Sequence, residues 1–164
     1  MPKAISTNTL FYGDNLPILR EHFADESIDL HITQDVFEHL FHPDKAFLEI
    51  ARTLKPGGAH LFTVPLVNKN QRSLQHAALR PDGTVDHRMP ATYHDDPIGP
   101  QSALVTFHWG YDICDYILNA TGLATSIFTP DDLSRGLRAE YIDVLMTIKP
   151  DPSPKATDLA AVSD

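Results

Sequence analysis

The residues best placed to do chemistry follow a predicted strand. Residues 27–33 alternate apolar and polar side chains, which is typical of a strand. Thr33, Gln34 and Asp35 therefore stand where this strand ends. Ligands of open α/β sheets bind in the crevice outside the carboxyl ends of the strands. We expect these three side chains to lie beside a bound small molecule.

A second group of candidate side chains lies partly within residues 66–105, a segment in which hydrophobic periodicity is lost. Tyr93 and His94 lie within this segment, and His39 and His108 lie outside it. Histidine can act as a general base because its unperturbed pKa lies near neutrality. We expect His39, Tyr93, His94 and His108 on the substrate side of a site. The dispersed histidines match no zinc template, so we expect no metal ion.

The elements that must position these residues alternate along the chain. Apolar spacing predicts strands and helices in βαβ order, which indicates an α/β fold with a parallel core. The expected strands cover residues 9–12, 27–33, 59–64, 124–129 and 141–148. The expected helices cover residues 16–23 and 43–54 and a segment that starts near Tyr111 and ends at Gly122.

The length of 164 residues fits one compact domain. We expect residues 1–149 to form it. Residues 66–105 are expected to be an inserted, partly ordered lid or pocket wall over the carboxyl ends of the strands, because functional groups gather on loops above a rigid scaffold. The proline-rich residues 150–164 are expected to be a disordered tail.

Composition excludes several classes of protein. The net charge of −9 opposes binding to a phosphate backbone, so we do not expect a nucleic-acid partner. The chain has no apolar run near the roughly 20 residues of a membrane helix, and no membrane association is expected. The first residues resemble no export or transit signal, and Cys114 is the single cysteine. We expect a cytoplasmic protein.

One long segment carries a family resemblance. Residues 29–40, which include Glu38 and His39, are followed by residues 47–52 and then 54–58. This succession of a strand, an acidic-His pair, a helix and a Pro-Gly-Gly turn resembles the middle of class I S-adenosylmethionine-dependent methyltransferases. The resemblance implies a Rossmann-like sheet, mostly parallel with a C-terminal antiparallel hairpin. It implies S-adenosylmethionine as the cofactor and a small-molecule substrate. Residues 93–97 resemble a subgroup that carries a histidine-bearing insert.

The chain departs from the family where such enzymes hold the cofactor. Gly13 is the one glycine before Gly57, and no Gly-x-Gly occurs in the sequence. The chain therefore resembles a methyltransferase truncated at its N-terminus, lacking the first strands and the glycine-rich motif. Residues 12–15 are similar to the motif whose aspartate contacts adenine. The resemblance thus implies a weakened cofactor site formed by Gly13, Asp14, Asn15, Thr33, Gln34 and Asp35.

Three functional hypotheses remain open at this point. The first is methyl transfer to a small-molecule or other non-nucleic-acid acceptor. The second is a catalytically inactive or partner-dependent remnant, whose site a homo- or hetero-oligomer would complete. The third rests on residues 10–19, which are similar to the opening of DNA amino-methyltransferases. That family continues into Asp-Pro-Pro-Tyr, whereas this chain has Thr33, Gln34, Asp35 and Val36.

Overall fold

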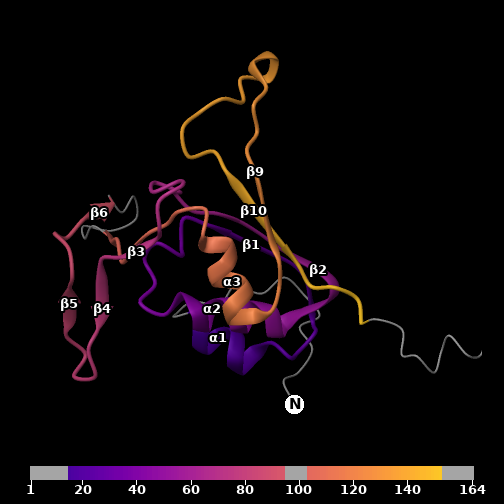
Figure 1. Ribbon diagram of the computed structural model, residues 1–164. Coiled ribbons are helices and arrows are strands. Elements are labelled where there is room, and N and C mark those ends of the chain that lie inside the picture. Colours follow the sequence, from indigo (N-terminus) through magenta and orange to yellow (C-terminus); the bar gives the residue numbers. More distant parts are fainter. Residues whose placement is uncertain (1–14, 95–102, 153–164) are drawn as a thin grey trace, which may run out of the picture.

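A four-stranded sheet organises the molecule. The computed structural model describes residues 15–94 and 103–152. The strands lie in the order β1-β2-β10-β9 (Figure 1). Strand β1 pairs in parallel with β2, whereas β10 runs antiparallel to both β2 and β9. The bounds are β1 Ile28–Gln34, β2 Leu54–Thr63, β9 Thr125–Phe128 and β10 Val144–Ile148. The α/β fold class and the C-terminal antiparallel hairpin are therefore confirmed.

Several predicted features lie outside the described residues. These are the strand expected at residues 9–12, Gly13 and Asp14, and most of the expected tail. Asn15 is the first residue of the first described helix, α1 (Asn15–His22). Of the described helices, none is long and apolar enough to span a bilayer.

Two helices cover one face of the sheet. They are α2 (Pro43–Thr53) and α3 (Ile113–Thr121), which pack against each other (Figure 1). Their apolar side chains recur at helical spacing and meet inward-facing residues of the strands. The resulting buried cluster consists of Phe37, Phe47, Ile50, Leu54, Phe62, Val64, Leu66, Trp109, Ile113, Ile117 and Leu145. Gly122 ends α3 with a φ of 75°, which confirms the predicted glycine cap.

The opposite face of the sheet is uncovered in the described part of the chain. The strand register places exposed apolar side chains on it from three strands. They are Leu30, Ile32, Phe128, Met146 and Ile148. Ile32 is 71% exposed, whereas its neighbours His31 and Thr33 point towards the helices and are half-buried. The period-two pattern of β1 thus places its apolar residues on the face without helices.

Strand β2 begins earlier than its sequence predicts. We expected residues 55–58 to be a turn before a strand at 59–64, but β2 starts at Leu54, directly after α2. Ile28 pairs with Leu54 and Leu30 with Ala59, so the extra residues of β2 form a bulge. Gly57 has a φ of 76°, which only glycine adopts without strain. The Pro-Gly-Gly stretch is therefore part of β2 and not a turn before it.

The segment between Leu66 and α3, which has no hydrophobic periodicity, forms short paired strands. Strand β3 (Leu74–Gln75) pairs with β8 (Phe107–His108). Strand β4 (Ala77–Leu79) pairs with β5 (Val85–His87), and β6 (Tyr93–His94) pairs with β7 (Ala103–Leu104). Figure 1 shows β4 and β5 as a hairpin at the left of the view, and the loop with η1 (Leu133–Arg135) projecting beyond β9 and β10.

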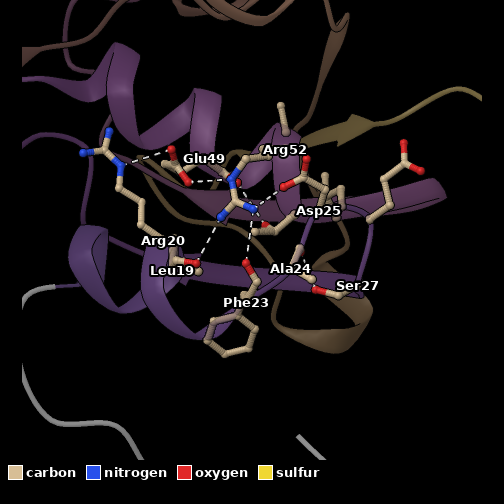
Figure 2. A network of polar contacts seen from close by, with 12 residues as sticks. Leu19, Arg20, Phe23, Ala24, Asp25, Ser27, Glu49 and Arg52 are labelled. Carbon is tan, nitrogen blue, oxygen red and sulfur yellow. Dashed lines mark hydrogen bonds and ion pairs between the residues drawn. The ribbon is translucent and has the colours of Figure 1, made fainter. Parts of the chain in front are cut away.

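Arg52 ties α2 to the end of α1. Its guanidinium donates to the carbonyl oxygens of Leu19 at 3.0 Å and Phe23 at 3.1 Å (Figure 2). It also contacts Asp25 and donates to Glu49 at 2.8 Å. Cations near a helix C-terminus satisfy its last carbonyls and interact favourably with the helix dipole. Arg52 therefore fixes the position of α1 and of the turn that enters β1.

Candidate functional site

The loop after β1 begins with an unusual backbone conformation. Asp35 has a φ of 49°, in the left-handed region that few residues other than glycine adopt, although aspartate adopts it more readily than most. Its amide donates to the Thr63 carbonyl at 3.1 Å, and the Thr63 hydroxyl donates to its carboxylate at 3.2 Å. The carboxyl ends of β1 and β2 are thereby joined, and the chain turns sharply into residues 36–42.

The three residues expected beside a ligand differ in their surroundings. Thr33 is half-buried, and its hydroxyl oxygen lies 2.9 Å from Nε2 of His60. Gln34 and Asp35 are exposed at the end of the strand. Burial, and secondarily the nearby His31, lowers the pKa of His60 to about 3, so its imidazole is neutral near neutral pH. His60 therefore positions the Thr33 hydroxyl without adding a charge.

A large cavity adjoins β1. Its volume of about 660 Å³ lies within the usual range for small-molecule sites. Thr33 is one of its few polar wall residues, whereas Gln34 and Asp35 do not line it. Side chains from α1, β1, the following loop and α2 form most of the wall, among them Leu16, Leu19, Ile32, Val36, Phe37, Leu40, Phe41 and Ala46.

Glu38 is the most unusual polar residue of the loop. Its side chain is 2% exposed, and neither carboxylate oxygen has a hydrogen-bond partner. Burial raises the pKa of Glu38. Its backbone is held firmly, because its carbonyl accepts hydrogen bonds from the Thr106 amide at 2.7 Å and the Thr106 hydroxyl at 3.0 Å. The loop thus presents a fixed carboxyl group that has no hydrogen-bond partner in the described part of the chain.

Histidines from distant parts of the sequence lie next to Glu38. Nε2 of His39 is 3.7 Å from the Glu38 carboxylate, and Nδ1 of His39 is 2.8 Å from the Leu104 carbonyl. The rings of His39 and His94 meet edge-to-face, with centroids 5.1 Å apart. The structure therefore brings together two of the histidines that the sequence marks as candidates.

The other candidates lie around this group. His108 packs against His76 with ring centroids 3.9 Å apart. Burial, followed by the nearby His76 and His94, lowers the pKa of His108. Tyr93 precedes His94 on β6 and is 53% exposed. Because consecutive strand residues point to opposite faces, Tyr93 points away from the side that His94 occupies.

Glu38 was not among the predicted site residues. The signal that could have identified it is a carboxylate among the apolar residues Val36, Phe37 and Leu40. Charged residues in such surroundings are rarely buried without a partner. His76, which packs against His108, was also not among the predicted site residues.

Residues 15–62 match the family model of the methyltransferase domain. This segment carries the methyltransferase signature. It covers under a third of the chain and includes α1, β1, the Glu38 loop, α2 and most of β2. The predicted resemblance to class I S-adenosylmethionine-dependent methyltransferases is therefore confirmed.

Comparison with solved structures finds partial matches at low sequence identity. A structure described as an S-adenosylmethionine-dependent methyltransferase from Listeria monocytogenes is 13% identical, with a TM-score of 0.49 over 82% of this chain and 67% of that one. One from Mesorhizobium loti is 17% identical, with a TM-score of 0.48 and coverage of 80% and 66%. A methyltransferase complexed with an activator from Haloferax volcanii is 15% identical, with a TM-score of 0.47 and coverage of 80% and 58%.

The methyltransferase signature thus occurs in a chain that is shorter than these structures. This chain spans about two-thirds of the length of the first two structures and a smaller share of the third. Among curated proteins, no sequence matches the chain.

Proposed function

We propose that the chain takes part in S-adenosylmethionine-dependent methyl transfer to a small-molecule or other non-nucleic-acid acceptor. The observation that carries this proposal is the methyltransferase signature over residues 15–62, which includes β1 and its carboxyl edge. The adjoining cavity of about 660 Å³ is large enough for a cofactor of this size. The net charge of −9 argues against a nucleic-acid acceptor.

The residues of the chain offer a partial fit to the cofactor. The cavity walls suit an apolar ring, and Thr33, Gln34 and Asp35 would supply polar contacts at the edge of the sheet. Gly13 and Asp14, which precede α1, and Asn15, which begins it, are further candidate residues. The glycine-rich loop of the family has no counterpart in the sequence, which contains no Gly-x-Gly. The proposed site therefore lacks the glycine-rich backbone that would lie close to the ligand.

The chemistry asks little of the protein. S-adenosylmethionine, when bound, supplies a methyl group on an electrophilic sulfonium. The protein must orient the acceptor and exclude water, and it needs a base only where the acceptor carries a proton. His39 and His94 are the candidate bases. His39 donates from Nδ1 to the Leu104 carbonyl in the tautomer that leaves Nε2 free to accept a proton.

Calorimetric titration with S-adenosylmethionine tests this proposal. Each missing charge-assisted hydrogen bond weakens binding by about 1.5 to 3 kcal/mol, so losing two lowers affinity by about a hundredfold or more. We expect saturable binding whose dissociation constant approaches millimolar, weakened further by Asp35→Ala. Absence of any binding heat at millimolar cofactor would contradict the catalytic proposal. Micromolar affinity would mean that Gly13 and its neighbours replace the missing loop.

The second candidate function is a catalytically inactive or partner-dependent form. One observation favours it: the uncovered sheet face exposes large apolar side chains, including Ile32 and Phe128. Extended apolar patches on a protein surface commonly mark interaction sites. In this form a homo- or hetero-oligomer would complete the cofactor site.

Sedimentation over a range of concentrations tests the homo-oligomeric form. A dimer that dissociates in Ile32→Asp, but persists in the control Leu133→Asp on the distant η1 loop, would support it. Both side chains are strongly exposed, at 71% and 66%. A monomer at every concentration would exclude a second copy as the completing partner.

A further inference from the structure

The unsatisfied carboxyl group of Glu38 is the starting point. Buried polar groups in folded proteins almost always have partners, because an unpaired one costs several kilocalories per mole. Glu38 is 2% exposed, and both of its oxygens lack a hydrogen-bond partner. Its backbone is fixed through Thr106, which is itself fully buried. A ligand that accepts electron pairs would satisfy this side chain.

His39 is oriented as a metal-binding histidine would be. Its Nδ1 lies 2.8 Å from the backbone carbonyl of Leu104, which can only accept a hydrogen bond. Nδ1 therefore carries the proton, and the lone pair of neutral His39 is on Nε2. Metal-binding histidines commonly donate their second ring nitrogen to a carbonyl in this manner. Nε2 lies 3.7 Å from the Glu38 carboxylate.

His94 completes a set of three donors. One ligand atom from each of Glu38, His39 and His94 lies within 4.8 Å of the other two. Ligand atoms of a tetrahedral zinc ion, at roughly 2.1 Å from the metal, are about 3.4 Å apart. The Glu38 to His39 separation is already close to this spacing. His94 is exposed, so its side chain has room to close the remaining distance.

We propose that Glu38, His39 and His94 bind one divalent transition-metal ion of the zinc type. Two histidines and one glutamate form a known set for zinc ions with an open coordination position. Two imidazoles disfavour Mg²⁺ and Ca²⁺, which prefer oxygen ligands. This proposal replaces the expectation of no metal ion, which rested on sequence spacing. The fold joins His94 to a pair of residues far away in the sequence.

An open coordination position on this ion could activate the acceptor in the proposed methyl transfer. This catalytic role rests on the proposed function, whereas metal binding itself does not. A hydroxyl of the acceptor bound there would lose its proton to solvent water more readily, because a divalent metal lowers the pKa of a coordinated oxygen. The metal would then replace His39 or His94 as the activating group. Acceptors with a hydroxyl would be favoured over those with a neutral amine.

Metal binding can be measured without cofactor or acceptor. The full chain is stripped with a chelator, titrated with Zn²⁺ by calorimetry and analysed for metal content. We expect one equivalent per chain. We also expect Co²⁺ to give the visible absorption of a four- or five-coordinate site. His39→Ala and His94→Ala should each weaken Zn²⁺ binding by about a hundredfold or more, because removing even an outer-shell partner costs 10- to 100-fold.

Two variants control for folding and for nonspecific histidine binding. His94→Ala removes an exposed side chain and should leave the thermal unfolding midpoint of the metal-free protein unchanged. His87→Ala removes an exposed histidine on β5, outside the cluster, and should leave Zn²⁺ affinity unchanged. Zn²⁺ affinity that is the same in wild type, His39→Ala and His94→Ala would overturn the proposal, as would no binding at all. Because S-adenosylmethionine is omitted, failure here leaves the methyl-transfer proposal standing.

Discussion

Hydroxyl and imidazole groups connect β1 to α2 and to β2 on the face of the sheet that the helices cover. His31 lies 2.8 Å from the Thr53 hydroxyl, and His60 lies 2.9 Å from the Thr33 hydroxyl. His60 is 1% exposed and stacks on Phe62, with ring centroids 4.5 Å apart. The Thr33 hydroxyl at the edge of the cavity is therefore held by a residue of the hydrophobic core.

His60 should make the stability of the protein depend on pH. Its pKa is about 3 in the folded protein, against 6.5 as the ordinary value. Between these values the unfolded chain binds more protons, so stability falls as the pH falls from 6.5 towards 3. The loss from this residue at pH 5 is on the order of 2 kcal/mol.

Replacing His60 tests this expectation. His60→Gln retains a polar side chain near Thr33 but cannot titrate, so its free energy of unfolding should fall less between pH 7 and pH 5. Urea denaturation at the two pH values measures the difference. His87→Gln, at an exposed position, should behave as wild type. Equal pH dependence in His60→Gln and wild type would show that His60 is not neutral in the folded state.

At the residue scale, the sequence predicted where β1 ends but not which side chains meet there. The alternation of β1 marks Thr33, Gln34 and Asp35 as its last residues and the start of the loop, and their contact with a ligand stays a prediction. His39 and His94 were identifiable as single candidates by residue type. Their contact was not predictable, because the short strands β6 and β7 that carry His94 and Leu104 to the loop have no periodic signal.

At the element scale, the Arg52 network decides where α1 lies. One guanidinium satisfies the carbonyls of Leu19 and Phe23 and pairs with Glu49 and Asp25 (Figure 2). Glu49 also pairs with Arg20 of α1. Because α1 forms one wall of the cavity, this network positions the candidate cofactor site from a distance.

Arg52→Met should therefore destabilise the protein while keeping the aliphatic stem. We expect a loss of about 1 to 2 kcal/mol in the free energy of unfolding, because carbonyls at the end of α1 lose a charged donor. The matched control is Arg138→Met, whose exposed pair with Asp131 should contribute less than about 0.5 kcal/mol. Equal losses in the two variants would contradict the role given to Arg52.

The Arg52 network should also lose its stabilising effect on the folded protein at acid pH. Burial opposes ionisation of Glu49, but hydrogen bonds from Arg52 and Arg20 outweigh it and lower the pKa of its carboxyl below 4.5. A carboxyl group with a lowered folded pKa stabilises the protein above its unfolded pKa, and this contribution disappears as the pH falls through the folded pKa. The stability difference between wild type and Arg52→Met should narrow below pH 4.5.

The elements themselves were largely predictable. Strands β1, β9 and β10 and helices α2 and α3 have apolar periods that continue for several residues. The predicted start of β2 was wrong, because Pro56 and the two glycines after it are typical of a turn. Their inclusion in the strand as a bulge depends on pairing with β1, which the local sequence does not show. The pattern of Leu30 and Ile32 showed a shared face but not which face the helices cover.

At the scale of the whole molecule, the fold combines a well-packed half with an open one. Helices α2 and α3 bury the core side of the sheet, while the other side exposes large apolar residues from β1, β9 and β10. The methyltransferase signature includes α1, β1, α2 and most of β2. We therefore propose that an incomplete cofactor site lies at the carboxyl edge of β1.

Site-resolved NMR of the labelled chain during titration with S-adenosylmethionine tests that claim most directly. We predict that the amide signals of Thr33, Gln34 and Asp35 shift together and approach saturation only near millimolar cofactor, because two charged contacts are missing. Signals of the distant η1 loop, such as that of Leu133, should stay in place. Unmoved signals at β1 in millimolar cofactor, or shifts confined to other parts of the chain, would contradict the account.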